Sequence, residues 1–315
     1  MFQGVEEIYY AVGAQGLKMG KRIPKYPVYI PSKGRSDRPL TAKMFDRDGV
    51  PFRFVVEPNE VPAYAADWGE ERVLVLPENN RGLVYSRNWI KQHAIGEGHE
   101  RHWQFDDDVW RLRRLHHGRR YPCDSRIALV VAEDFVDRYE NVGLCSFNSS
   151  FFVPATQGIS LQKWPPFYLN SRCYTNFLMM NSLPYGWRNR YNEDTDMTLQ
   201  VLAGGWCTIL FNVFVMDTPE TMEAHGGQMM SATGSYQGDG RLKMARELER
   251  VWPHVVETRR RFKRPQHHIK HDWKKFDTPL VRKAGVEDAP PDEYGMALVP
   301  QKREKDDGGK RGRVG

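Results

Sequence analysis

The chain has 315 residues, 40% of them hydrophobic and 12% aromatic, which is enough to bury the core of one α/β domain with an appendage and excludes a disordered protein. Its four cysteines lack CxxC spacing, which argues against a zinc knuckle or a disulfide framework and predicts small buried residues in a reducing compartment. With no apolar leader and no run of about 18 apolar residues, we expect a cytoplasmic protein without membrane contact.

The net charge of +6 is distributed unevenly along the chain. Residues 241–315 carry 20 Lys and Arg against 12 Asp and Glu, whereas residues 1–240 carry 26 against 28. This asymmetry predicts a near-neutral body and a cationic C-terminal part that meets a polyanion; the alternative is a solvated helix and a frayed tail. We divide the chain into an N-terminal lead-in, a main domain, a basic helical extension and a disordered tail, at residues 1–25, 26–240, 241–300 and 301–315.

Short β-type runs alternate with helix-forming sequence through the first 220 residues, as in α/β folds. Strands are expected within 27–32, 52–58, 72–78 and 101–109, and a helix over 84–98 leads into the fourth of them. Three aspartates end this fourth strand. In open α/β sheets ligands bind at the carboxyl ends of strands, so we expect a site there.

The second half continues the alternation. An arginine-rich connection over residues 110–120 precedes a helix over about 125–139, and further strands are expected at 142–152, 172–181 and 206–217. Between the last two, the acids at 192–196 open an amphipathic helix that turns four residues inward: Met197, Leu199, Val201 and Leu202.

The last part of the chain contains two further segments of distinct composition. Residues 226–240 are rich in Gly and Ser, as in loops that close over substrates, and residues 245–276 are expected to be helical or partly so.

The segment WQFDDDVW, residues 103–110, places three consecutive carboxylates after apolar strand residues. Alternation along a strand sends Asp106 and Asp108 to one face and Asp107 to the other, so the first two can share a divalent cation. A metal would remove the cost of crowded like charges in an apolar setting. The alternative is an Asp-rich turn at the strand end.

Several motifs occur in a fixed order: VYIPSKGR at 28–35, NNRGLVYSRNW at 79–89, FDDDV at 105–109, NED at 192–194, and then His225. In this order, over about residues 26–230, the chain resembles a GT-A glycosyltransferase. The resemblance implies a Rossmann-like nucleotide-diphospho-sugar transferase fold, an α/β mixed sheet flanked by helices, here with the basic C-terminal helical extension. It also implies a nucleotide-sugar donor, with a UDP-sugar expected, and a divalent metal, Mn²⁺ or Mg²⁺.

The resemblance also implies roles for individual residues. Asp106 and Asp108 would bind the metal, and His225 would complete its shell unless it is a surface or core histidine. Arg87 and Asn88 would contact the base or ribose. The other residues carried over to the nucleotide site are Pro31, Ser32, Arg35, Glu57, Gly82, Asp106 and Asp107. Glu57 is alternatively an exposed turn acid, and Asp107 has no assigned contact.

Hydroxyl attack at the anomeric carbon with inversion needs a carboxylate that accepts the acceptor's proton. The candidate is Asp194, with Glu193 and Asp196 as rivals, although acids at a helix start are also ordinary capping residues. Tyr185 and Trp187 precede them and form either a stacking wall or part of the core.

The run at 259–276 interleaves Lys and Arg with Phe262, Trp273 and Phe276, a combination that pairs with phosphates and stacks on bases. His267, His268 and His271 are expected on this basic surface. The arginine-rich stretch at 110–120 adds positive charge that contacts the acceptor or the donor diphosphate.

In detail, YIPSKGR, NNRGLVYSRNW, FDDDV and NEDTDMTLQ resemble the phage glycosyltransferases associated with TET/JBP-type DNA hydroxylases. This resemblance implies hexosyl transfer onto the hydroxyl of 5-hydroxymethylcytosine or a related base in DNA, in the host cytoplasm for a phage-encoded enzyme. Three alternatives stay open: a GT-A enzyme acting on a carbohydrate or protein, a metal-dependent nuclease or nucleotidyltransferase, and a non-catalytic DNA-binding module.

Overall fold

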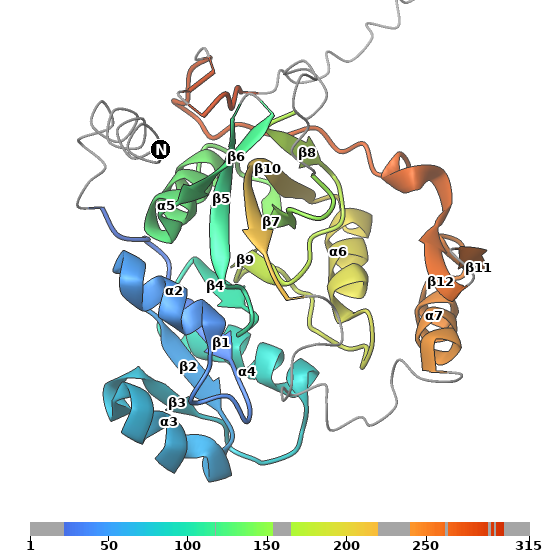
Figure 1. The fold of residues 1–315 in the computed structure, drawn as a ribbon. Helices are drawn as coiled ribbons and strands as arrows, with labels where there is room; N and C mark the ends of the chain where they lie inside the picture. The colour runs from blue at the N-terminus through green and yellow to red at the C-terminus, as the bar shows by residue number, and fades with distance from the viewer. Residues whose placement is uncertain are drawn as a thin grey trace, which may run out of the picture.

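A computed structural model describes most of the chain, namely residues 22–116, 118–153, 165–219, 240–261, 264–288, 291, 292 and 294–298. Its centre is a ten-stranded mixed sheet flanked by helices, as expected (Figure 1). The order of the strands is β3-β2-β1-β4-β9-β7-β10-β5-β6, with β8 paired to β10. Their bounds are β1 Val28–Pro31, β2 Arg53–Val56, β3 Val73–Val75, β4 Arg101–Phe105, β5 Arg111–His116, β6 Arg119–Cys123, β7 Val142–Ser149, β8 Phe167–Leu169, β9 Asn176–Met180 and β10 Cys207–Asp217.

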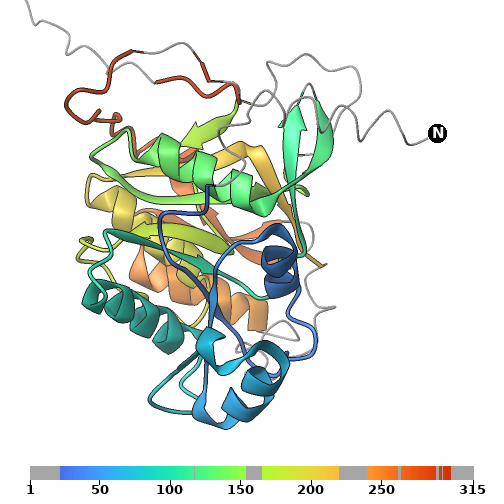
Figure 2. The same cartoon turned by 90° about the vertical axis from the view of Figure 1, so that its left-hand side faces the viewer.

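The N-terminal half is a parallel unit of β3, β2, β1 and β4. It carries the helices α2 (Leu40–Asp48), α3 (Val61–Trp68) and α4 (Leu83–Gly96). Side chains alternate along β1, so Ile30 joins the core that includes Phe45 of α2, while Tyr29 packs with Ile90 of α4 on the other face. Figure 2 accordingly shows α2 and α4 on opposite sides of β1.

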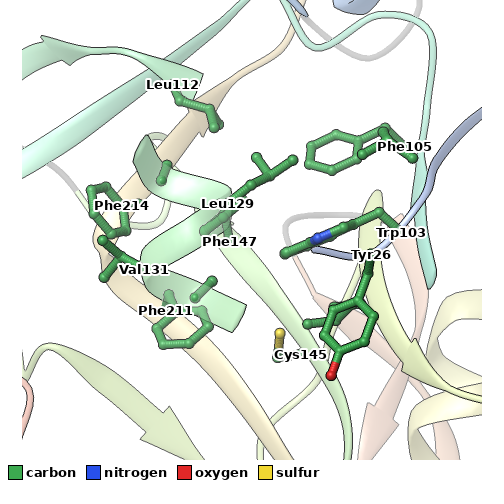
Figure 3. Packing of buried hydrophobic residues seen from close by; sticks show 14 of the residues in the cluster. Tyr26, Trp103, Phe105, Leu112, Leu129, Val131, Cys145, Phe147, Phe211 and Phe214 are labelled. Atoms are coloured by element: carbon green, nitrogen blue, oxygen red, sulfur yellow. The ribbon is translucent and has the colours of Figure 1, made fainter. Parts of the chain in front are cut away.

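The second half adds antiparallel pairs and two helices, α5 (Ser125–Val136) and α6 (Glu193–Ala203). Aromatic side chains of β4, β7 and β10 form a continuous core with α5 (Figure 3). The rings of Trp103 and Phe147 stack with centroids 5.5 Å apart. Fully burying each such side chain contributes roughly 1.5–3 kcal/mol, which fixes the strands relative to one another.

Seven strands end at one edge of the sheet, namely β1, β2, β3, β4, β6, β7 and β10. β1, β2 and β4 are mutually parallel, and β7 and β10 run in the same direction as β4, because both β4 and β7 pair antiparallel with β9. We call this edge the carboxyl edge. It gathers Ser32, Glu57, Asp106, Ser150 and Asp217, so residues far apart in sequence share one surface.

Residues 110–120 do more than connect elements. They form most of the antiparallel pair β5 and β6, which extends the sheet beyond β10. The expectation of a connection was therefore wrong, because the alternation of Leu112 and its charged neighbours suits a half-buried strand. The helix and strands expected after this segment are confirmed as α5, β7, β9, α6 and β10. Three cysteines are buried, Cys123 is half-buried, and all four are free.

The basic extension is helical at its start and again over a short 3-10 turn, η4 (Lys270–Trp273), but not between them. After α7 (Gly240–Val251) the chain forms an antiparallel hairpin of β11 (Val256–Arg261) and β12 (Arg264–Ile269). The helical extension that we expected is wrong for this hairpin, because Pro253 and Pro265 disfavour a continuous helix and inward-facing Val256 pairs with Ile269.

The extension is also not separate from the main body. Leu199 of α6 packs against Leu248 of α7 and against the hairpin, and Figure 1 shows α7 and the hairpin beside α6. Farther along the chain, Leu280 and Met296 return to the main hydrophobic core. No helix in the described ranges is long and apolar enough to span a membrane.

Candidate active site

Three aspartates follow β4 directly at the carboxyl edge. The backbone N–H of Asp106 donates to the carbonyl of Thr175, which holds the turn against the segment before β9 (3.0 Å). The Asp106 carboxylate accepts from Arg87 of α4 (2.6 Å), whereas Asp107 points to the opposite side and is buried. β4 ends at Phe105 and residues 107 and 108 form a turn, so the three acids stand in the turn that was the alternative to strand alternation. Asp108, the last of them, is half-buried.

Asp107 is the anchor of the turn. It accepts a hydrogen bond from Ser32 (2.5 Å) and forms a buried ion pair with Arg35. The Ser32 hydroxyl also lies 2.6 Å from the hydroxyl of Tyr64 in α3. Pro31 ends β1 just before this network. The motif VYIPSKGR is thus brought to the site. Its Ser32 and Arg35 side chains bind Asp107 and hold the turn in place.

Arg87 is almost fully buried. Its guanidinium contacts the rings of Phe177 and Trp187, 5.0 and 4.9 Å from their centroids, and it also donates to Gln104 (3.3 Å). Such a cation is fixed by its surroundings, so its bond to Asp106 orients that carboxylate. The contact that we expected, to a base or ribose, stays a prediction.

Asn88 has a similar local partner. Its amide donates to the carbonyl of Trp187 (2.6 Å) and accepts from the N–H of the same residue (2.9 Å). Trp187 is 2% exposed and belongs to a core cluster, with half-buried Tyr185 packed against it, so core packing is the correct alternative for both. Gly82 precedes α4 at φ 80°, a conformation that favours glycine, with open space where a Cβ would stand.

Glu57 is buried at the end of β2, and the alternative of an exposed turn acid is wrong. Lys33 bridges it to the next loop, with its ammonium 2.7 Å from the Glu57 carboxylate and 2.7 Å from the side-chain oxygen of Asn80. Lys33 lies inside the motif VYIPSKGR but was not predicted as a site residue. The motif shows which residues are close in sequence, and it does not show that Lys33 contacts Glu57 and Asn80 in the fold.

The acids that open α6 differ in their partners. Asp194 forms an ion pair with Arg172 (2.5 Å) and accepts from the N–H of Thr195 (2.6 Å). Burial would raise the pKa of Asp194, but these contacts outweigh it and hold that pKa below its usual range. Glu193 forms no ion pair with any described basic residue, and burial, reinforced by Asp194, raises its pKa to about 7 against the effect of Arg87.

Asp196 is fully buried and serves the fold. It accepts from Arg188 (2.8 Å), from the indole N–H of Trp252 (2.7 Å) and from Gln200 (3.0 Å). Trp252 lies directly after α7, so this carboxylate joins the extension to α6. The sequence predicted neither this role nor Arg172, because pairings across many positions leave no local pattern.

Asp106 and Asp108 stay the residues that would hold a divalent cation. Burial raises the pKa of both; for Asp106 it reaches about 7, with Arg87 opposing the shift and Asp108 and Glu193 adding to it. The described ranges hold no cluster of three or more His, Cys, Asp or Glu that could bind a metal. Two carboxylates completed by substrate phosphates and water are a usual donor set for Mg²⁺. His225 lies outside the described residues.

His267 of β12 brings the hairpin next to the acids of α6. Burial lowers its pKa to about 4, with Arg172 adding to the shift and Asp194 opposing it. It is therefore a neutral, half-buried residue, and its assignment to the basic surface was wrong. Other expectations fall outside the described parts of the chain: Phe262, the side chain of His271, the loop 226–239 and the tail 301–315.

The parallel unit with acids at its carboxyl edge, extended by antiparallel strands, defines a glycosyltransferase-like Rossmann fold. A family model described as TET-Associated Glycosyltransferase matches residues 26–227, from just before β1 to beyond β10, and the chain belongs to this family. It is a glycosyltransferase, which decides against the nuclease and the non-catalytic module. No curated protein matches the chain.

Proposed function

We propose that the chain transfers a sugar from a nucleotide-sugar, with a UDP-sugar expected, onto the hydroxyl of 5-hydroxymethylcytosine or a related modified base in DNA. One arrangement carries this proposal. The carboxylates of Asp106 and Asp108 lie at the carboxyl edge, and the arginine-rich hairpin of β11 and β12, which we call the arginine hairpin, packs against α6 next to its acids. The first feature suits a diphosphate leaving group, and the second suits a polyanionic acceptor.

The donor half rests on Asp106 and Asp108. These two carboxylates would hold Mg²⁺ or Mn²⁺, which when bound neutralises the charge that develops on the departing diphosphate. Arg87 orients Asp106 from one side, and the network around Asp107 fixes the turn from the other. Glu57 and Gly82 lie along the same edge, where the nucleoside is expected.

Glu193 is the better candidate for the proton acceptor in an inverting transfer. Asp194 is neutralised by Arg172, and Asp196 is committed to Arg188 and the extension, so neither suits a proton acceptor. Glu193 lacks such a partner and lies near enough to Asp106 to raise its pKa. Its own pKa of about 7 matches the working range of a general base.

The arginine hairpin of β11 and β12 binds the phosphates of the acceptor in this proposal. Arg259, Arg260, Arg261 and Arg264 are exposed near its tip. Arg259 pairs with Glu257 (2.6 Å), and the other three form no ion pair with any described acid. Unneutralised arginines on a narrow two-stranded ribbon suit the phosphates of a nucleic acid, and their binding falls with salt.

The test is incubation with UDP- and GDP-sugars, Mn²⁺ or Mg²⁺, and DNA containing either cytosine or 5-hydroxymethylcytosine, followed by mass analysis of the nucleosides. A hexose added only to the hydroxymethylated base supports the proposal. The absence of any sugar adduct on DNA across the panel, with carbohydrate or protein acceptors modified instead, would overturn the DNA acceptor. Asp67→Asn, an exposed aspartate in α3, serves as the unaffected control.

A further inference from the structure

Every exposed aromatic side chain among the large hydrophobic residues of the described ranges lies at the carboxyl edge. These are Trp110, Phe151 and Phe152, which are 37%, 81% and 57% exposed. We call them the aromatic rim. Apolar side chains that are exposed together in one region mark a binding surface, whereas single scattered ones do not.

The two loops that carry the rim are hydrogen-bonded to neighbouring residues of β10. The N–H of Trp110 donates to the carbonyl of Asp217 (3.1 Å), and the N–H of Ser150 donates to that of Met216 (2.9 Å). Asp217 and Met216 are the last two residues of β10. Trp110 follows Asp108 by two positions, so the rim begins beside the carboxylates proposed to hold the metal.

A chain of contacts links the rim to the acids of α6. Phe151 packs edge-on against Phe152, and Phe152 packs edge-on against Tyr174, with centroids 5.2 and 5.9 Å apart. The guanidinium of Arg172 lies 5.6 Å from the Tyr174 ring and pairs with Asp194. The rim thus borders both acidic groups of the site, on the side of β7 and β10 and away from the nucleotide half.

We propose that the aromatic rim stacks on the acceptor base, a pyrimidine displaced from its neighbours so that its hydroxyl reaches the carboxylates. This inference rests on the proposed function, since it assumes a nucleic-acid acceptor. Enzymes that act on a base take it out of the stack, and aromatic side chains replace the stacking that it loses. The nearby arginine hairpin favours a base over a carbohydrate ring, because it binds the phosphates that accompany a base.

The test compares two oligonucleotides that differ at one position, which holds either 5-hydroxymethylcytosine or an abasic site. The wild-type protein is expected to bind the first at least about fivefold more tightly, as the loss of one stacked base implies. Phe151→Ala with Phe152→Ala, and separately Trp110→Ala, should bring this ratio close to one. Phe151→Trp should retain the ratio, and Ile95→Ala, an exposed residue near the end of α4, should leave it unchanged.

Donor hydrolysis without acceptor reports whether each variant is folded and binds the nucleotide-sugar, and it should stay at the wild-type rate. Arg261→Ala with Arg264→Ala should weaken binding of both oligonucleotides equally and reduce the salt dependence. If the rim variants also weaken both equally, or leave the preference intact, stacking is overturned while the DNA acceptor stands. If the wild type neither binds nor modifies DNA, the proposed function fails first. Loss of transfer to a carbohydrate in the rim variants would assign the rim to sugars and contradict the inference.

Discussion

The two acidic groups of the site are held in opposite ways. After β4, burial raises the pKa of Asp106 and Asp108, and only one of them has an arginine partner. At the start of α6, Asp194 and Asp196 are each neutralised by an arginine, and Glu193 alone is left without one. At α6 the carboxylates paired with an arginine hold the fold, and Glu193, which has no ion-pair partner among the described residues, suits a proton. After β4, in contrast, the pKa of Asp106 stays raised in spite of Arg87, and Asp108 has no ion-pair partner among the described residues, which suits a cation.

Glu193 provides the sharpest test of this contrast. Glu193→Gln should lower kcat by about 10²- to 10⁴-fold, the contribution of a general base, with little change in the KM for the donor. Asp194→Asn should have a smaller effect, because that carboxylate positions Arg172. The measurement is steady-state transfer to 5-hydroxymethylcytosine DNA, with exposed Glu70→Gln as control. A larger loss in Asp194→Asn would return the role of base to Asp194.

Asp108 tests the other side of the comparison. Asp108→Asn should lower the transfer rate by about 10²- to 10³-fold, the scale expected for losing one electrostatic stabiliser. Its stability should be unchanged or higher, because the substitution relieves repulsion with Asp107. Transfer kinetics and thermal unfolding measured on one preparation would check both parts. A variant that transfers normally would show that this cluster does not act on the donor.

Asp196 should behave as a purely structural acid. Asp196→Ala removes the acceptor shared by Arg188, Gln200 and Trp252, and should lower the free energy of unfolding by about 3 kcal/mol. Activity per folded molecule should change little. Denaturant unfolding, with exposed Asp67→Ala as the matched control, measures the first effect. If stability is unchanged and activity is lost, Asp196 belongs to the reaction.

His102 lies in β4, the strand that ends directly before Asp106. It is buried, bonds to Asn181, and has a pKa lowered to about 4 by burial. Between pH 6.5 and 4 the unfolded chain therefore binds a proton that the folded chain does not, so stability falls as the pH falls through this window. The contribution is about 2 kcal/mol between pH 7 and pH 5.

His102→Gln should remove this part of the pH dependence. The comparison is between the unfolding free energies of wild type and variant at both pH values. Equal pH dependence in the two proteins would mean that His102 does not carry the effect.

The sequence predicted most of the sheet, because strands such as β1, β7 and β10 have local apolar runs that are sufficient on their own. It missed the hairpin of β11 and β12. There, arginines dominate the composition, and only the pairing of Val256 with Ile269 and the packing onto α6 select a strand. It also missed the strand role of residues 110–120, where one face is polar.

For the site, the sequence by itself determined which acids exist, that three of them end a buried strand, and that others open a helix, since spacing of a few residues fixes these facts. Only the tertiary structure decided which acids are neutralised. Arg87 reaches Asp106, Arg172 reaches Asp194 and Lys33 reaches Glu57 from other elements of the fold. Such pairings depend on how elements pack, and a carboxylate's surroundings, more than its place in a motif, set its charge and its availability for chemistry.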